Sequence, residues 1–371
     1  MTGHASVPPV SAPAVQAGVD AAWVSRQVTD VLDAFLADKT AWARTAGLPA
    51  DVPAALGEFL AAGGKRIRPL LCVLGWHAGQ GRGSAQQAVR VGAALEMFHA
   101  FALVHDDVMD RSDTRRGRPA MHRSIAARHG RGRTSAEAEK FGAGAAILAG
   151  DLALIWSDEL VRGRETGLDT AQCERVLPLF DLMRSEVMYG QYLDLMATGR
   201  PTVVIEDALR IIRYKTAKYT MERPLHIGAT LATADEGLLA ALSAFALPLG
   251  DAFQLRDDLL GAFGRPETTG KSTLDDLREG KHTVLITHAL RHADADQAEL
   301  LRTLYGAPEL GDEGADAVRA VLRDLEADRV VEDMIRSRYA QAVAALDEAP
   351  VPEAVRTQLR TLARQAVWRT S

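Results

Sequence analysis

Two short groups of aspartates stand out in the sequence, and each follows an apolar run. The first group is Asp106, Asp107 and Asp110, and the second is Asp257 and Asp258. Asp106 and Asp110 are four residues apart, so a helix places both on one face, one turn apart. Their carboxylates would repel each other without a cation between them, and Mg²⁺ prefers oxygen ligands. The aspartates therefore predict a site for divalent metal ions.

Basic residues lie close to the first aspartate group in the sequence. Arg115 and Arg116 follow it within a few positions, and guanidinium groups suit phosphate oxygens. Further upstream, two glycines precede a basic cluster in residues 63–69, and such glycines let the backbone approach an anion. Carboxylates for a metal beside cations for phosphate predict a site for a magnesium-bound polyphosphate. Either charged cluster, taken singly, would also fit a solvated surface.

The elements that must position these residues are helices. Hydrophobic residues make up 47% of the 371 residues, and Ala and Leu dominate over Val, Ile and Thr. Apolar residues recur at three- and four-residue spacing in several long segments, among them 21–36, 89–104, 176–195 and 318–346. We therefore predict an all-α fold with one domain over residues 20–371. Residues 1–19 are rich in Pro, Ala, Val and Ser and are expected to form a flexible tail.

Charge and cysteine content exclude several classes of protein. The formal net charge of −6 argues against a nucleic-acid surface. Cys72 and Cys173 are the two cysteines, and we expect core thiols rather than a disulfide. No apolar run approaches the roughly 20 residues that a membrane span needs, and no signal peptide is evident. We expect a cytoplasmic protein that is not an integral membrane protein.

The first aspartate group and its arginines resemble the first aspartate-rich motif of the polyprenyl synthetase family, the trans-isoprenyl diphosphate synthases. The family pattern is DDxxD followed, after four residues, by RRG, and residues 106–117 read DDVMDRSDTRRG. The further matching elements are GGKRxRP at 63–69, GQxxD at 190–194, KT at 215–216, FQxxDD at 253–258, GK at 270–271 and DLxxGKxT at 276–283. The resemblance implies a helical bundle around a central apolar cavity, and it implies a homodimer.

The resemblance also implies roles for individual residues. The metal ligands would be Asp106, Asp107, Asp110, Asp257 and Asp258, with Asp194 helping to hold the metal shell. The ligands of isopentenyl diphosphate would be Lys65, Arg68, His99 and Arg116, and Arg115 would also bind substrate. The groups around the allylic substrate would be Gln191, Lys215, Thr216, Gln254, Lys271 and Lys281. The resemblance implies three Mg²⁺ ions per active site, for which Mn²⁺ could substitute. Gly261 stands where the family has the last acid of the second motif.

These residue types support one kind of reaction. Metal ions and lysines would neutralise a diphosphate that leaves an allylic carbon, and an apolar bundle would keep water from the resulting cation. A second diphosphate would bring an alkene within attack distance. The substrates would be isopentenyl diphosphate and an allylic diphosphate (dimethylallyl, geranyl or farnesyl). The released diphosphate would remove the final proton, as the resemblance implies, and no protein nucleophile is needed.

Product length in the family is set by residues before the first motif. Ala102 leaves room, whereas Phe101 and Phe98 share its helix face and would close a deeper floor. This pattern is similar to that of geranylgeranyl diphosphate synthases. Farnesyl or longer polyprenyl diphosphates are alternative products, and these phenylalanines could also simply fill the core. A class I terpene cyclase and a catalytically silent modulatory subunit are the competing functions.

Overall fold

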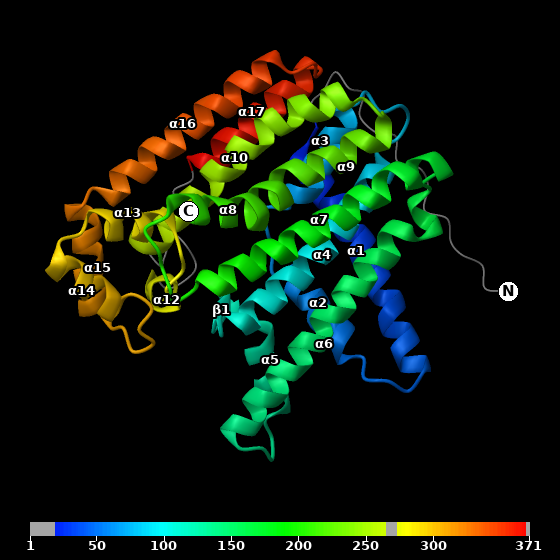
Figure 1. Ribbon diagram of the computed structural model, residues 1–371. Coiled ribbons are helices and arrows are strands. Elements are labelled where there is room, and N and C mark those ends of the chain that lie inside the picture. Colours follow the sequence, from blue (N-terminus) through cyan, green and yellow to red (C-terminus); the bar gives the residue numbers. More distant parts are fainter. Residues whose placement is uncertain (1–18, 265–272, 369–371) are drawn as a thin grey trace.

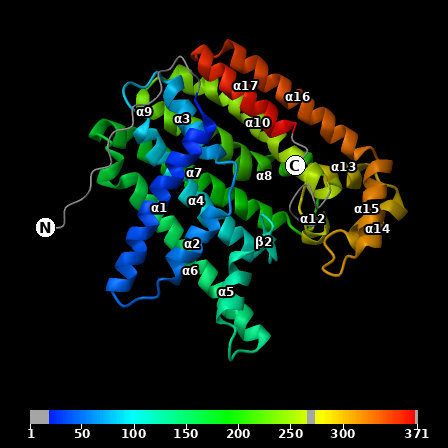
Figure 2. The ribbon, with the colours of Figure 1, turned by 180° about the vertical axis from the view of Figure 1, so that it is seen from behind.

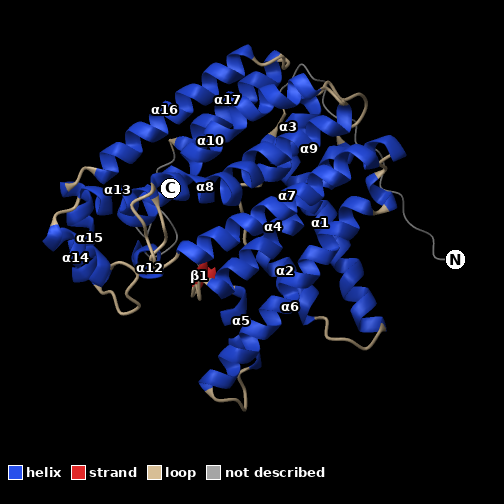
Figure 3. Cartoon of the chain, in the orientation of Figure 1, coloured by secondary structure: helices blue, strands red, loops and turns tan. Residues whose placement is uncertain are grey.

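The structure is a computed structural model, and it describes residues 19–264 and 273–368. Helices dominate this part of the chain (Figures 1 and 3), which confirms the predicted all-α fold. The expected tail over residues 1–19 lies almost entirely outside the described residues. The helices of the first half are α1 (Ala21–Thr45), α2 (Asp51–Ala61), α3 (Ile67–Ala78), α4 (Gln86–Met109), α5 (Met121–His129), α6 (Ser135–Arg162), the 3₁₀ helix η1 (Arg164–Thr166) and α7 (Thr170–Ala197). The helices of the second half are α8 (Ile205–Ile211), the π-helix η2 (Ile212–Glu222), α9 (Arg223–Ala232), α10 (Glu236–Phe263), α12 (Thr273–Glu279), α13 (Val284–His292), α14 (Ala295–Leu304), α15 (Asp312–Asp324), α16 (Ala327–Glu348) and α17 (Glu353–Val367). Two short antiparallel strands, β1 (Thr114–Arg115) and β2 (Arg118–Pro119), form a turn after α4.

The long helices pack as a bundle with α4 and α10 as its principal members. Helix α4 packs against α3 and α6, and α10 packs against η2 and α16. The segment η2 also contacts α7, so it links the two parts of the bundle. Seen from both sides, α16 and α17 run along α10, and α12 to α15 gather at one end (Figures 1 and 2). The carboxyl ends of α4 and α10, where the aspartates lie, thus belong to neighbouring parts of one bundle.

Two hydrophobic clusters form the core. One cluster joins α1 to α7 and includes Phe98 and Phe180, both fully buried. The other is organised around α10 and the C-terminal helices and includes Phe245, which is also fully buried. Each cluster is the apolar face of several amphipathic helices, and its burial is the main source of stability.

The segment η2 is an unusual element because π-helices are rare and mostly limited to a single turn. It spans 11 residues and carries the predicted KT pair, Lys215 and Thr216. Its neighbours approach it closely: a Cβ at Gly190 of α7 would collide with the backbone of Lys215, and one at Gly250 of α10 would collide with Ala217. Glycines on both flanks therefore allow the wider helix to fit between α7 and α10.

Two predicted segments have different boundaries in the structure. The periodic segment 318–346 is divided between α15 and α16, because Glu326 adopts a positive φ of 54°. The stretch 129–140 contains two glycines and many charged residues, a pattern that predicts a surface loop; it is mostly exposed, but the chain becomes helical at Ser135. A capping box between Thr134 and Glu137 starts α6 there, because each side chain satisfies the other's backbone N–H.

Two helices of the described chain are long and apolar enough to pass a test for membrane spans, which corrects the expectation that no run approaches that length. They are α4 and α10, and 72% and 50% of their most apolar windows are buried inside the protein. By length and composition alone, a buried core helix passes the same test. The two cysteines are free thiols, as predicted, and Cys72 is buried in the core.

Candidate active site

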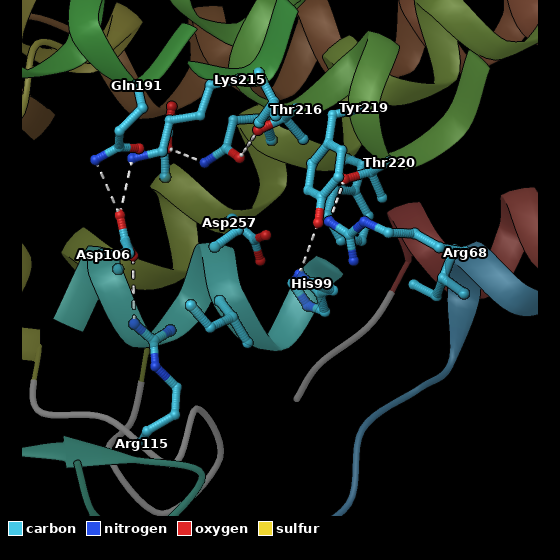
Figure 4. A pocket seen from close by; sticks show the side chains of 18 of the residues that line it. Arg68, His99, Asp106, Arg115, Gln191, Lys215, Thr216, Tyr219, Thr220 and Asp257 are labelled. Atoms are coloured by element: carbon cyan, nitrogen blue, oxygen red, sulfur yellow. Dashed lines mark hydrogen bonds and ion pairs between the residues drawn. The ribbon is translucent and has the colours of Figure 1, made fainter. Parts of the chain in front are cut away.

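A cavity of about 500 Å³ lies where α3, α4, α7, η2, α10 and α12 meet (Figure 4). Most of the residues predicted from sequence line it, although they come from distant parts of the chain. The predicted residues in its wall are Arg68, His99, Ala102, Asp106, Arg115, Arg116, Gln191, Lys215, Thr216, Gln254, Asp257, Asp258 and Lys281. The wall therefore combines two aspartate groups with lysines on one side and a group of arginines on the other.

Other predicted residues lie outside this wall. Lys65 is exposed beside the cavity, and Asp110 lies at the C-terminal end of α4. Phe98 and Phe101 are buried behind Ala102, and their ring centroids are 5.2 Å apart. Lys271, together with the GK pair to which it belongs, falls outside the described residues.

Asp106 is the centre of a polar network at the mouth of the cavity (Figure 4). Its Oδ1 accepts from the amide of Gln191 at 3.2 Å and pairs with Nζ of Lys215 at 3.3 Å. Its Oδ2 pairs with Arg115 at 3.3 Å. Lys215 also pairs with Asp194 at 2.6 Å. Burial lowers the pKa of Lys215, but the charges of Asp106 and Asp194 raise it more, so this ammonium stays charged.

Asp107, which was also predicted as a metal ligand, has a different environment from Asp106. Its side chain is fully buried, and the guanidinium of Arg115 donates to its Oδ1, through Nε at 2.8 Å and through Nη2. The carboxylate does not line the cavity. Asp107 instead fixes Arg115 against the first motif, and the i, i+1 spacing explains why the two neighbouring aspartates point in different directions.

The second aspartate group faces the cavity from α10. Gln254 accepts from the hydroxyl of Thr216 at 2.7 Å and donates to Oδ1 of Asp258 at 2.9 Å. Burial, with the charges of Asp257 and Asp276, raises the pKa of Asp258 to about 7, although the hydrogen bond from Gln254 opposes this. The chain Thr216–Gln254–Asp258 thus ties η2 to the acidic end of α10.

Gly261, where the family pattern has an acid, packs directly against Asp276 of α12. A Cβ at position 261 would overlap Oδ2 of Asp276, so the carboxylate of Asp276 occupies the space of a side chain at 261. Asp276 lines the cavity together with Asp257 and Asp258. The site therefore has a third carboxylate at this end, although it comes from a different helix.

Lys281 lies among carboxylates close to these aspartates. Its Nζ is 3.2 Å from Asp110 and 2.7 Å from Glu279. Burial lowers the pKa of Lys281, but these carboxylates and Asp276 hold it well above its ordinary value. Burial also raises the pKa of Glu279 to about 7. The acidic side of the cavity thus carries two half-buried ammonium groups, those of Lys215 and Lys281.

The opposite side of the cavity concentrates positive charge. Arg66, Arg68 and Arg116 line it, together with Glu96, which pairs with Arg66 at 2.5 Å, whereas Arg115 lies at the acidic end beside Asp106. Burial lowers the pKa of Arg116, and the neighbouring arginines lower it further against the influence of Glu96. Cations that depress one another's pKa in a cavity make a favourable place for a polyanion.

The backbone at both ends of this cationic group is specialised. Gly64 has a φ of +150°, and a Cβ there would lie 2.7 Å from Nη2 of Arg116. Arg66 and Arg116 have φ values of 46° and 55°, which non-glycine residues rarely adopt. Gly64, directly before the basic cluster, therefore makes room for an arginine from the turn after α4.

His99 completes the cationic side without carrying a charge. Burial and then Arg68, Arg116, Arg115 and Arg66 hold its pKa well below the ordinary value. Its Nδ1 is 3.2 Å from the hydroxyl of Tyr219 on η2. The imidazole is therefore neutral at pH 7 and acts through hydrogen bonds.

Sequence reasoning missed several residues in this wall. They are Arg66, Glu96, Tyr219, Thr220 and Asp276. Arg66 belongs to the basic cluster that the sequence already indicated, and Tyr219 follows Lys215 by four residues, one helical turn. No local pattern indicated Glu96, because its role depends on a partner 30 residues away.

The carboxylates that face the cavity fit the way in which proteins usually bind Mg²⁺. Within residues 19–264 and 273–368, no three His, Cys, Asp or Glu side chains converge closely enough to hold an ion by themselves. Mg²⁺ keeps several waters and is usually bound by one or two carboxylates together with substrate phosphates. Asp106 and Asp257, which face the same cavity with oxygen ligands only, fit this mode of binding.

Comparisons with known proteins show the family to which this chain is similar. The sequence profile named polyprenyl synthetase matches residues 51–324. A geranylgeranyl diphosphate synthase of Mycobacterium tuberculosis is 34% identical over 74% of this chain and 71% of that enzyme. An octaprenyl diphosphate synthase of Escherichia coli is 32% identical over 67% of this chain and 69% of that enzyme.

A solved structure shows the same architecture. The geranylgeranyl pyrophosphate synthase of Corynebacterium glutamicum, crystallised with isoprenyl diphosphate and magnesium, is 38% identical, with a TM-score of 0.90. The match covers 95% of this chain and 100% of that one. The chain therefore belongs to the polyprenyl synthetase family and is a prenyltransferase that elongates trans-prenyl diphosphates.

Proposed function

We propose that the protein condenses isopentenyl diphosphate with allylic diphosphates in the presence of Mg²⁺ and that its main product is geranylgeranyl diphosphate. The observation that carries this proposal is the division of one cavity into two differently charged sides. Asp106, Asp257 and Lys215 form one side, and Arg68 and Arg116 belong to the other. Two anionic groups, one of them with metal ions, can therefore bind within one cavity.

The acidic side would bind and activate the allylic diphosphate. Asp106, Asp110 and Asp257 are the residues that would hold magnesium, which when bound neutralises the negative charge of the departing diphosphate. In this structure Lys215 and Lys281 are paired with carboxylates. When those carboxylates bind metal ions, both ammonium groups would be free to bind the diphosphate oxygens.

The carbon that loses diphosphate becomes an allylic cation, and residues near it must not react with it. Thr216 directs its hydroxyl proton to Gln254, so its oxygen lone pairs are available to stabilise positive charge nearby. Ala102, Leu103 and Val187 supply apolar wall that excludes water.

The arginine side would hold isopentenyl diphosphate with its double bond directed at that cation. Arg68, Arg116 and the neutral imidazole of His99 would bind the diphosphate, with Lys65 at the exposed edge. This side argues against a terpene cyclase, which needs no second diphosphate. The presence of both aspartate groups argues against a silent modulatory subunit.

Product length depends on the floor of the cavity. Ala102 is in the wall, and the rings of Phe101 and Phe98 lie behind it. Phe98 also packs edge-on against Tyr219, with ring centroids 5.7 Å apart. This aromatic layer supports a product of intermediate length, and the farnesyl and longer products are the alternatives to be tested.

The test is an incubation of purified protein with Mg²⁺, isopentenyl diphosphate and dimethylallyl, geranyl or farnesyl diphosphate, followed by mass analysis. We expect a linear product with 20 carbons. A product of 15 carbons, or of 30 or more, would overturn the length assignment. Hydrocarbons formed without isopentenyl diphosphate would indicate a cyclase, and no turnover would indicate a modulatory subunit.

We further propose that the protein is a homodimer. Exposed apolar side chains recur every seven residues on α6, at Phe141, Leu148 and Ile155, and on α7, at Leu182, Tyr189 and Met196. This spacing places each set on one helix face, and extended apolar patches mark interaction surfaces. A cytoplasmic location remains our proposal from sequence, to be tested by cell fractionation.

A further inference from the structure

Tyr219 lies on the cationic side of the cavity, next to His99 and Arg68. Its side chain is 3% exposed, and it extends from η2 toward α3 and α4 (Figure 4). The hydroxyl is 3.2 Å from Nδ1 of His99, and the guanidinium of Arg68 lies over the ring at 4.2 Å from its centroid. One aromatic side chain therefore contacts two of the proposed diphosphate ligands.

The hydroxyl matters because His99 is neutral. A neutral imidazole carries its proton on one nitrogen only, and the other nitrogen is an acceptor. A diphosphate presents oxygen acceptors, so His99 binds it only through an N–H group. With Nδ1 facing Tyr219, the nitrogen left for the diphosphate is Nε2. The proton must then be on Nε2, and Nδ1 must accept a hydrogen bond from its partner.

We propose that Tyr219 is a positioning residue, which donates its hydroxyl proton to Nδ1 of His99 and thereby holds the imidazole as the Nε2–H tautomer that binds isopentenyl diphosphate. The identity of this anion rests on the proposed function, but the tautomer assignment does not need turnover. The opposite arrangement, with Nδ1–H donating to Tyr219, would direct an Nε2 lone pair at the phosphate oxygens.

The surroundings of Tyr219 keep its hydroxyl in the donor form. Burial raises the pKa of Tyr219 to about 12, although the nearby Arg68 opposes this, so the phenol remains protonated. The ring is held in place by Phe98 on one side and by Arg68, whose Nη2 donates to Thr220 at 2.6 Å. Tyr219 and Thr220 thus orient both Arg68 and His99 from the same turn of η2.

A direct test is the protonation of the His99 ring nitrogens, measured by ¹⁵N NMR of protein labelled at histidine. The sample contains Mg²⁺ and isopentenyl diphosphate without an allylic partner, so no reaction occurs; inorganic diphosphate is a second probe. His99→Gln identifies the signal among the 10 histidines. We expect protonated Nε2 and unprotonated Nδ1. A proton on Nδ1, or on both nitrogens, would overturn the proposal.

The kinetic test uses Tyr219→Phe, which removes the hydroxyl and keeps the ring that packs on Arg68 and Phe98. We expect the KM for isopentenyl diphosphate to rise about tenfold, as for the loss of one hydrogen bond to a ligand group, with kcat and the KM for the allylic substrate within twofold. Tyr339→Phe, which also removes a hydroxyl and keeps a packed ring, here on α16 against Trp368, is the matched control and should change none of these values.

A double variant separates positioning from a general structural effect. In the His99→Gln background, Tyr219→Phe should change the KM for isopentenyl diphosphate by less than twofold, because its effect passes through His99. Equal effects in both backgrounds, or equal rises in both KM values, would contradict the proposal. If Tyr219→Phe does not fold, the NMR measurement on the unsubstituted protein still decides the tautomer. A failed elongation assay would overturn the proposed function only.

Discussion

On the acidic side of the cavity, each lysine forms ion pairs with two carboxylates. Lys215 pairs with Asp106 and Asp194, and Lys281 pairs with Asp110 and Glu279. A carboxylate that binds a metal ion must exchange its ammonium partner for that ion, and the ammonium then needs another anion. Metal and diphosphate should therefore bind together more favourably than either binds alone.

Asp106→Ala and Asp257→Ala should each reduce turnover by several orders of magnitude, because both carboxylates face the cavity and would hold metal ions. The measurement is kcat at saturating substrates, with circular dichroism to confirm the fold. Asp113→Ala is the control, since Asp113 is highly exposed in its ion pair with Arg123. Near-normal turnover in the first two variants would refute the metal assignment.

Gly261→Ala should raise the Mg²⁺ concentration needed for half-maximal activity, because the new methyl group displaces the carboxylate of Asp276. In an exposed helix the same change usually stabilises by about 1 kcal/mol. Gly57→Ala on α2 is the control variant, because its new methyl group would contact only the side chain of Leu36, at 3.8 Å. The assignment fails if both variants keep the Mg²⁺ requirement of the parent protein.

Asp258 should make the protein less stable as the pH rises from about 5 to 7. Its folded pKa of about 7 lies above its ordinary value of 3.8, so the folded state binds the proton more tightly and loses this advantage on ionisation. Over this interval the loss is roughly 2–3 kcal/mol at most. Urea unfolding in EDTA should show it, and Asp258→Asn should make the profile flatter; an unchanged slope would contradict the assignment.

At the scale of single elements, α4 acts as both wall and floor. Its polar end carries Asp106, and one turn earlier Ala102 lines the cavity, with Phe101 and Phe98 buried on the same helix. We propose that these three side chains set how far the cavity extends. A helix rises about 1.5 Å per residue, so moving the floor by one turn changes the depth by about 5 Å. This distance corresponds to roughly one prenyl unit.

Phe101→Ala should lengthen the product by at least one five-carbon unit, because it opens the aromatic layer below Ala102. Mass analysis of products from farnesyl diphosphate measures this directly. Phe245→Ala is a matched control: it also removes a fully buried ring, but from the other hydrophobic cluster. The floor must lie elsewhere if Phe101→Ala leaves the product unchanged or if Phe245→Ala lengthens it equally.

For the whole molecule, the exposed apolar faces of α6 and α7 determine the expected assembly. Leu148→Glu places a charge at a position that is 64% exposed in the single chain and should weaken the dimer. Light scattering should then show a shift from twice 39.9 kDa toward 39.9 kDa. Trp42→Glu, at an equally exposed position on α1, should leave the mass unchanged. A monomeric parent protein would refute the proposed dimer.

Local patterns in the sequence predicted the parts of the molecule that depend on local physics. Helical periodicity predicted α4 and α7, and the spacing of Asp106 and Asp110 predicted a carboxylate pair. Contacts between distant residues were not predictable in this way. Tyr219 meets His99 across 120 positions, and Asp276 fills the space at Gly261 only because α12 folds back on α10.

The π-helical segment η2 would link the binding of the two substrates. Its 11 residues carry Lys215 near one proposed substrate and Tyr219 near the other. A ligand that restrains one end of so short a segment also restrains the other. Binding energies of the two substrates are then linked, and such linkage is reciprocal: each changes the affinity of its companion by the same factor. Cooperativity between the allylic diphosphate and isopentenyl diphosphate would thus originate in this single widened helix rather than in the side chains that bind either diphosphate.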